Sequence, residues 1–213
     1  MKFKHLSILL IAFIGFGFGL SAKLQKKVDK VIKSTFKVET FSFNAITISP
    51  KINEEVPSKF GSDNLFEIKS SDKLLGYAYL AKAPSKTADY DYLVLIDAEL
   101  VVIKAKVLIY REEYGGEIGS TRWLKQFIGK TQLDDLKYGE NIIAISGATI
   151  SVRSFTEAMN NLLKSPSFSE RYTARIVGLG IFFIPDISPF YAYIANGVLD
   201  LTDGGNFSLI KRK

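Results

Sequence analysis

The chain has 213 residues, a net charge of +6 at neutral pH and 47% hydrophobic residues, which favours one domain with terminal extensions and a core of its own. It contains no cysteine, which excludes disulfides, zinc–cysteine sites, iron–sulfur clusters and cysteine nucleophiles. The one histidine, His5, lies in the N-terminal segment, which excludes a Ser-His-Asp hydrolase and leaves redox chemistry to a bound organic cofactor.

The basic residues are concentrated in two places, in the segment 23–33 and in the last three residues, 211–213. Between them lies no arginine-rich strip with interleaved aromatic residues, the pattern typical of nucleic-acid binding. We therefore expect no nucleic-acid partner.

Residues 1–22 combine a basic start with an uncharged stretch from Leu6 to Ala22. This pattern predicts a signal peptide or a membrane anchor. The anchor is favoured because Leu20 occupies the place where a signal peptidase needs a small residue. The lysines that follow would keep the domain cytoplasmic by the positive-inside rule, whereas the signal-like start favours export.

Residues 23–36 carry apolar side chains at helical spacing, which predicts a juxtamembrane helix. We expect one helix to run from the uncharged stretch into this segment. The apolar positions are Leu24, Val28, Val31, Ile32 and Phe36.

The middle of the chain carries strand patterns separated by short polar turns. Such turns connect antiparallel neighbours, so an antiparallel meander of about four strands is expected. Lys104 and Lys106 alternate with apolar residues and place one face of the last strand nearer to solvent. The expected strands span residues 64–70, 74–84, 90–97 and 100–110.

The stretch "REEYGGEIGSTRWLKQFIGK", residues 111–130, predicts a tight glycine loop followed by a short helix. Ser120 or Thr121 is expected to cap this helix, which would present Trp123, Leu124 and Phe127 on one face. A glycine loop between a strand and a helix can hold a phosphate, but a turn before a core-facing helix explains the pattern equally well.

Residues 145–151 read "ISGATIS" and are expected to lie at a passage from a strand to a helix. The hydroxyl groups of Ser146, Thr149 and Ser151 would cap the helix or hold an anion at its N-terminus. On physical grounds alone the cap is the commoner use of such residues.

Ser154 and Glu157 also match a capping box, which would begin the helix three residues after Ser151. The helix is identified by a stripe of Val152, Phe155, Met159, Leu162 and Leu163.

Together these patterns predict an α+β fold, an antiparallel β-meander packed with a few helices and preceded by an N-terminal membrane or signal helix. The domain is expected over residues 37–165, and residues 166–213 form an apolar C-terminal extension of unknown role. Within it, residues 176–199 would form either a membrane-dipping hairpin or, the favoured interpretation, a pair of buried strands or a cover over the core.

Two of these stretches resemble one protein family. "SGAT" is similar to the flavinylation motif of the FMN-binding domain family, which includes the membrane-anchored flavin subunits of Rnf and sodium-pumping NADH:quinone oxidoreductase complexes. "EEYGGEIGSTRWLKQFIGK" resembles the family's glycine loop and the W-x-x-Q-F-x-G-K-like helix after it. The resemblance covers about residues 65–165. It departs from the family at Ile143, where members often have an acidic residue.

The resemblance implies that Thr149 carries FMN through a phosphoester bond, installed by a separate FAD-dependent flavin transferase. Ser146, Gly147 and Ala148 would shape the turn, and Ser151 would hydrogen-bond the phosphate. Trp123 would pack either against the flavin or in the core, and the core is the favoured interpretation. The residues expected near the isoalloxazine or the ribityl chain are Glu117, Ile118, Gly119 and Ser120.

The function implied is a membrane-tethered electron-transfer flavoprotein on the extracytoplasmic (periplasmic) side, working with membrane redox partners rather than as a stand-alone enzyme. One alternative is a non-catalytic binding or assembly module with an unmodified SGAT turn, which Ile143 favours. Another is a flavin reductase that uses dissociable FMN.

Overall fold

The structure is a computed structural model of the chain that describes residues 21–165, 198–199 and 209–210. The predicted signal peptide or anchor lies outside this range except for its last two residues. The hairpin or buried strands expected over 176–199 also lie outside it, apart from two residues of a strand.

The chain divides into two compact units, Met1–Phe168 and Ser169–Lys213. The second unit is described only by two short strands, β6 (Val198–Leu199) and β7 (Leu209–Ile210), which pair antiparallel. All further structural statements concern the first unit.

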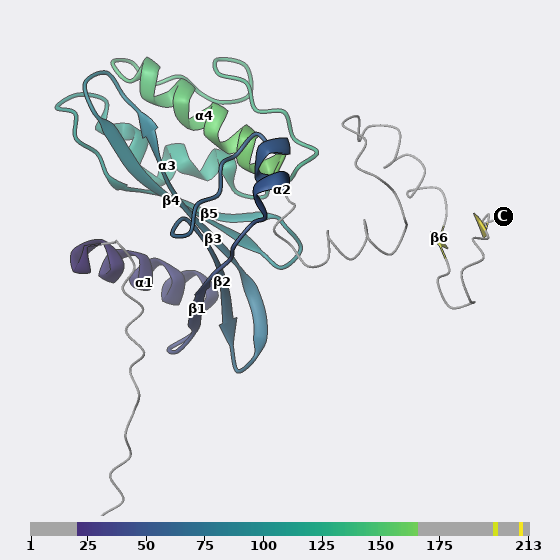
Figure 1. Ribbon diagram of the computed structural model, residues 1–213. Coiled ribbons are helices and arrows are strands. Elements are labelled where there is room, and N and C mark those ends of the chain that lie inside the picture. The colour runs from purple at the N-terminus through teal and green to yellow at the C-terminus, as the bar shows by residue number, and fades with distance from the viewer. Residues whose placement is uncertain (1–20, 166–197, 200–208, 211–213) are drawn as a thin grey trace, which may run out of the picture. The chain divides into compact units, whose positions relative to one another are not determined.

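An antiparallel sheet forms the centre of the first unit, and its strands lie side by side in chain order (Figure 1). The predicted meander is therefore confirmed, with one more strand than expected. The additional strand is short and largely exposed at the sheet edge, so its residues show no clear alternation. A short helix, α2 (Pro50–Glu55), follows it. The strands are β1 (Ser42–Ala45), β2 (Leu65–Ser70), β3 (Lys73–Pro84), β4 (Asp89–Asp97) and β5 (Val102–Ile109).

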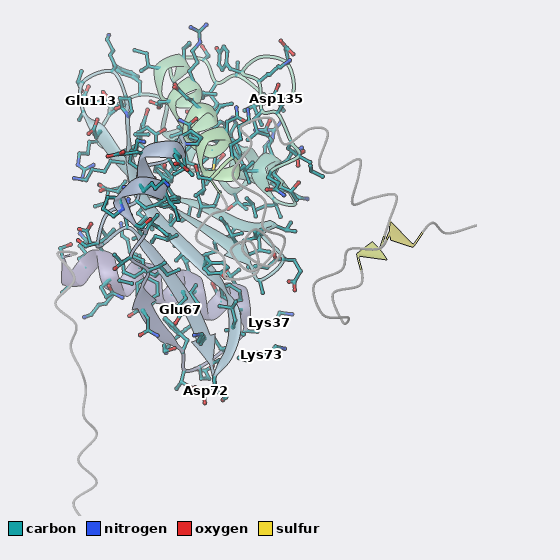
Figure 2. All side chains as sticks on the ribbon, turned by 45° about the vertical axis from the view of Figure 1, so that its right-hand side comes forward. Lys37, Glu67, Asp72, Lys73, Glu113 and Asp135 are labelled. Atoms are coloured by element: carbon teal, nitrogen blue, oxygen red, sulfur yellow. The ribbon has the colours of Figure 1, made fainter. Side chains whose placement is uncertain are left out.

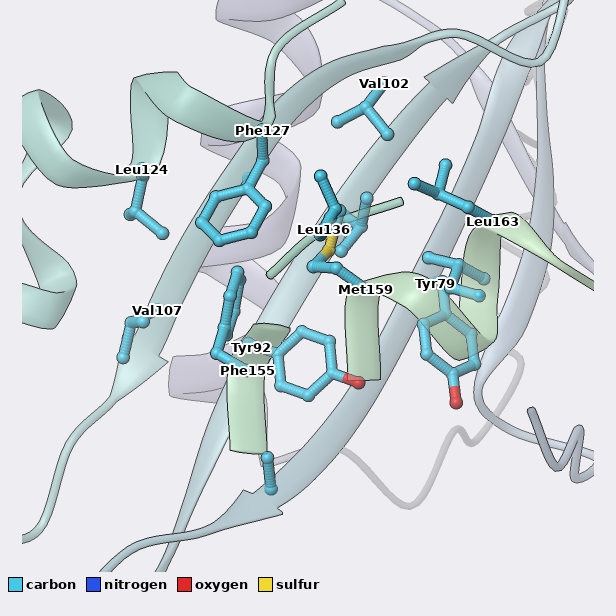
Figure 3. Close-up of a cluster of buried hydrophobic side chains, with 14 of the residues drawn as sticks. Tyr79, Tyr92, Val102, Val107, Leu124, Phe127, Leu136, Phe155, Met159 and Leu163 are labelled. Atoms are coloured by element: carbon cyan, nitrogen blue, oxygen red, sulfur yellow. The ribbon is translucent and has the colours of Figure 1, made fainter. Parts of the chain in front are cut away.

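The sheet is covered on both faces. Helix α4 (Thr149–Leu163) lies across one face and helix α1 (Ala22–Phe36) across the other (Figure 1). Because side chains alternate along a strand, each face receives every second residue of β3 and β4. The core under α4 is rich in aromatic residues (Figure 3) and includes Tyr79, Tyr92, Trp123, Phe127, Phe155 and Met159.

Helix α1 is packed on the sheet by its apolar side, with Leu24, Val28 and Ile32 buried. The expectation of one helix continuing from the uncharged stretch is wrong. Ser21 has extended backbone angles and caps the helix, its hydroxyl accepting a hydrogen bond from the N–H of Leu24 at 3.3 Å. Among the helices of the described ranges, none combines the length and apolarity that crossing a bilayer requires.

Short helical pieces connect β5 to α4. A 3₁₀ turn, η1 (Gly116–Gly119), precedes α3 (Thr121–Leu124), which continues into η2 (Lys125–Phe127). The strand expected before α4 is absent from this described part of the chain, where a single bridge joins Tyr138 to Ile142. The passage is instead held by side-chain hydrogen bonds.

Candidate functional site

The SGAT turn does not cap its helix with a hydroxyl group. Helix α4 begins at Thr149, and the preceding Ala148 occupies the cap position without a side-chain hydrogen bond. Gly147 has a φ of 76°, the left-handed conformation that favours glycine, and thereby turns the chain into the helix. The interpretation of these residues as a plain hydroxyl cap is therefore wrong.

The capping box is also absent, because Ser154 is already in the second turn of α4. Its hydroxyl donates to the carbonyl of Pro84 at 2.7 Å instead of closing a box with Glu157. This tertiary hydrogen bond ties α4 to the end of β3.

The first turn of α4 consequently presents unused backbone donors. Within the described part of the chain, the N–H groups of Thr149, Ile150 and Ser151 have no acceptor. Thr149 is exposed and its hydroxyl likewise makes no hydrogen bond to the described residues. A helix N-terminus with unpaired N–H groups attracts an anion, so a phosphate on this hydroxyl would lie in a favourable field.

The glycine loop contacts the SGAT turn directly. A Cβ atom on Gly115 would lie 2.6 Å from the Cβ of Ala148 and 3.2 Å from the carbonyl oxygen of Gly147. Gly115 also has a φ of 77°. Only glycine satisfies both conditions, so the packing of the glycine loop on the SGAT turn requires glycine at position 115.

The residues expected near the isoalloxazine or the ribityl chain follow this contact in η1. Glu117 is exposed, Gly119 is half-buried, and the side chain of Ile118 is fully buried. Ser120 caps α3, its hydroxyl accepting from the N–H of Trp123 at 3.2 Å, as expected for a helix start here. The hydroxyl of Ser120 is therefore used by α3. Ile118 is the one buried member of the set, and Glu117, Gly119 and Ser120 are at least partly accessible to solvent.

Trp123 and Gln126 hold the segment that leads into the SGAT turn. The indole N–H of Trp123 donates to the carbonyl of Ile143 at 2.7 Å, and the amide oxygen of Gln126 accepts from the N–H of Ile143 at 2.7 Å. The ring of Trp123 lies in the core against Phe127 and Phe155, which confirms the favoured prediction of a core position. Gln126 was not identified from the sequence, although it belongs to the W-x-x-Q-F segment.

Ser151 is buried, and two tyrosines fix it. Its hydroxyl lies 3.0 Å from the hydroxyl of Tyr110, and its carbonyl accepts from the hydroxyl of Tyr90 at 2.9 Å. Tyr90 is fully buried, and burial raises the pKa of its hydroxyl well above the ordinary value, so it remains a donor at physiological pH. The two tyrosines therefore position the first turn of α4 from the ends of β4 and β5.

Glu112 fastens the start of the glycine loop to the β3–β4 turn. Its carboxylate accepts hydrogen bonds from the hydroxyl of Ser85 and from the N–H groups of Thr87 and Ala88. These donors, the Ser85 hydroxyl foremost, lower the pKa of Glu112 to about 2. The next residue, Glu113, lies at the end of the domain opposite the β2–β3 hairpin (Figure 2).

Replacing Glu112 with glutamine is expected to remove one source of acid sensitivity. The folded-state pKa is below the ordinary value of 4.5, so the stabilisation is complete above that pH and is lost as the pH falls towards 2. Thermal unfolding of both proteins between pH 7 and pH 2 measures this. The wild-type advantage should be largest at neutral pH and shrink below pH 4.5. An advantage independent of pH would contradict the assignment.

The described residues contain no group of three or more histidines, aspartates and glutamates that could hold a metal ion. The site offers unpaired backbone donors, the exposed hydroxyl of Thr149 and open space beside the backbone of Gly147. This donor set suits a phosphorylated organic ligand.

Comparison with known proteins finds a family model that matches part of the chain. Residues 87–164 match the family model described as the FMN-binding domain, a range that includes the glycine loop, the SGAT turn and all of α4. This segment of the chain is an FMN-binding domain.

The fold is also similar to that of the crystal structure of Shewanella oneidensis NqrC. The TM-score is 0.53, the identity is 16%, and the similarity covers 72% of this chain and 100% of that one. At this identity the likeness establishes the fold alone. No curated protein matches the chain.

Proposed function

We propose that this FMN-binding domain is an electron carrier with FMN attached to the hydroxyl of Thr149 through its phosphate. The observation that carries the proposal is the state of Thr149 in the structure. Its hydroxyl is exposed and unpaired among the described residues, at a helix N-terminus whose first N–H groups are also unpaired. A Cβ atom on Gly147 would meet nothing within 4 Å, so a ligand has room to approach the backbone of the SGAT turn there.

The attachment balances with FAD as the donor. The Thr149 oxygen forms a bond to the phosphorus of the FMN half, the pyrophosphate bond of FAD breaks, and AMP leaves while the threonine proton is lost. The chain gains the mass of FMN less one water. No base for this proton lies in the SGAT turn, which agrees with the need for a separate flavin transferase.

The protein's own part is to bind and orient. The N–H groups of Thr149, Ile150 and Ser151 would donate to the phosphate oxygens, while Tyr90 and Tyr110 keep that turn rigid. Bound FMN supplies reversible electron transfer, and covalent attachment prevents its loss. The chain needs no acid–base residue for such a role.

The proposal places the domain on the extracytoplasmic side, tethered to a membrane and exchanging electrons with membrane redox partners. It is supported by the basic start and the uncharged stretch of residues 1–22. A cofactor that cannot dissociate is of most use outside the cytoplasm, where it could not be replaced.

Replacing Thr149 with valine is expected to abolish the covalent flavin. Valine keeps the shape of the side chain and replaces the hydroxyl group with a methyl group, so the fold should persist at this exposed position. The measurement is in-gel flavin fluorescence of the denatured full chain after co-expression with a flavin transferase. Thr40→Val, at another exposed threonine, is the matched control and should fluoresce like wild type. Equal fluorescence of Thr149→Val and wild type would disprove the attachment site.

A second candidate function is a binding or assembly module with an unmodified turn, and Ile143 favours it. The side chain of Ile143 is 69% exposed, so the position where relatives often carry an acid is open to solvent here.

Replacing Ile143 with glutamate is expected to increase the rate of flavin loading without loss of stability. The hydrogen bonds from Ile143 to Trp123 and Gln126 are made by its backbone C=O and N–H groups, so a new side chain leaves them in place. The measurement is the fraction of protein modified against time, with Ile143→Gln as an uncharged control. No modification of wild type or variant by a transferase that modifies another SGAT protein would contradict the covalent attachment, and absence of bound FMN as well would leave the assembly module.

A further inference from the structure

The exposed side of helix α1 is strongly basic. The helix carries five lysines and a single acidic residue, Asp29, which accepts a hydrogen bond from Gln25 at 2.8 Å. The lysines recur at helical spacing opposite the buried residues, and all five are exposed. We call this surface the α1 lysine face, and it consists of Lys23, Lys26, Lys27, Lys30 and Lys33.

The sheet beneath α1 extends this basic surface. Lys104 and Lys106 of β5 pair with Leu95 and Leu93 of β4, which belong to the core under α1. Residues opposite one another share a face of the sheet, so both lysines lie on the α1 side, half-buried. Lys27 joins helix and strand by donating to the carbonyl of Leu108 at 2.7 Å.

The α1 lysine face also contains an open hollow. The aliphatic parts of lysine side chains form most of its wall, and their ammonium groups can reach a phosphate headgroup placed over it. Within the described part of the chain, every charged residue that lines this hollow is a lysine. Its lining consists of Ala22, Lys23, Lys26, Lys27 and Lys30.

We propose that the α1 lysine face lies on an anionic phospholipid surface and orients the domain there. The helix has a net charge of +4 and begins at Ala22, where the uncharged stretch of the sequence ends, so these lysines stand next to the segment predicted to reach the bilayer. Anionic headgroups attract basic residues in such a position. The apolar side of α1 is buried in the sheet, so the contact is electrostatic and the helix does not insert.

The contact has a consequence for the flavin site. The SGAT turn and α4 belong to the opposite face of the sheet, since Ala148 is part of the core under α4. With α1 on the lipid, the SGAT turn faces away from the bilayer. A membrane redox partner would then reach Thr149 only through a part that projects from the bilayer into the aqueous phase. The lipid contact itself does not depend on whether FMN is attached.

The test is lysine labelling of the full chain with an amine-reactive acetyl reagent, read residue by residue by mass spectrometry. One sample is bound to phosphatidylcholine vesicles and another to vesicles that also contain phosphatidylglycerol. On the anionic vesicles, labelling of the α1 lysine face should slow about five-fold or more. Each lysine near the surface is attracted by about 1 kcal/mol, which corresponds to about a five-fold smaller population of the free, reactive ammonium group. High salt should restore the labelling. The exposed control lysines, Lys125, Lys137 and Lys164, should not change.

A charge-reversal variant separates this face from general basicity. Glutamate replaces Lys23, Lys26, Lys30 and Lys33, and Lys27 remains as the reporter because its carbonyl contact is kept. In this variant, Lys27 should be labelled as fast on anionic vesicles as on phosphatidylcholine vesicles, so that its protection from labelling is lost. It should keep the protection when Lys125, Lys137 and Lys164 are changed to glutamate. Equal labelling of the α1 lysine face on both kinds of vesicle would overturn the proposal and leave an acidic protein as the partner.

Discussion

Gly115→Ala is expected to destabilise the domain by about 2–5 kcal/mol, since the left-handed backbone costs an L-residue about 1–2 kcal/mol and the overpacking about 1–3 kcal/mol more. The new Cβ would lie 2.6 Å from the Cβ of Ala148, closer than two carbon atoms can pack. Relief requires the glycine loop and the SGAT turn to separate. The same substitution should therefore slow or prevent flavin loading of Thr149.

Gly116→Ala is the matched control for this prediction. Gly116 is the next residue, its φ is not positive, and a Cβ there meets nothing within 4 Å. We expect a change within about 0.5 kcal/mol and normal flavin loading. Denaturant unfolding and the loaded fraction are measured on both variants. If Gly115→Ala is as stable and as readily loaded as Gly116→Ala, the two motifs do not depend on their contact.

Phe155→Ala is expected to cost about 3–5 kcal/mol, the usual range for truncating a buried phenylalanine. Phe155 is fully buried and projects from α4 into the aromatic core (Figure 3). Its ring lies 4.9 Å from that of Phe127, 5.2 Å from that of Tyr92 and 5.6 Å from that of Trp123, measured between ring centroids. Removing the ring leaves a cavity beside the tryptophan that holds the approach to the SGAT turn.

The fluorescence of Trp123, the one tryptophan of the chain, reports this unfolding directly. Phe155→Leu is the control, because leucine fills part of the space and should cost clearly less. Equal destabilisation by alanine and leucine would show that the ring contacts contribute little and that α4 is held mainly by its hydrogen bonds.

Much of the fold could be predicted because burial dictates residue pattern. The long strands β3 and β4 alternate between two apolar faces, and the stripe on α4 matches its buried side. Strand β1 could not be predicted, because a short exposed edge strand needs no apolar alternation. The covering of the second sheet face by α1 was also missed, since an apolar helix stripe does not say what it packs against.

The sequence predicted which motifs form the candidate site, but it did not predict the hydrogen bonds between them. Serine and threonine suggested a cap, yet Ala148 holds that position because Gly147 makes the turn and the hydroxyl of Ser154 bonds to the end of β3. The hydrogen bond from the N–H of Ile143 to Gln126 joins residues 17 positions apart. Local propensity contains no information on such pairs, whereas the resemblance pointed to both segments.

Mass spectrometry of the peptide that contains the SGAT turn tests the central claim most directly. Trypsin cleavage after Lys137 and Arg153 releases residues 138–153 of the full chain, prepared with a competent flavin transferase. We predict that this peptide gains the mass of FMN less one water and that fragmentation places the addition on Thr149. An unmodified peptide, or an addition on Ser146 or Ser151, would contradict the account.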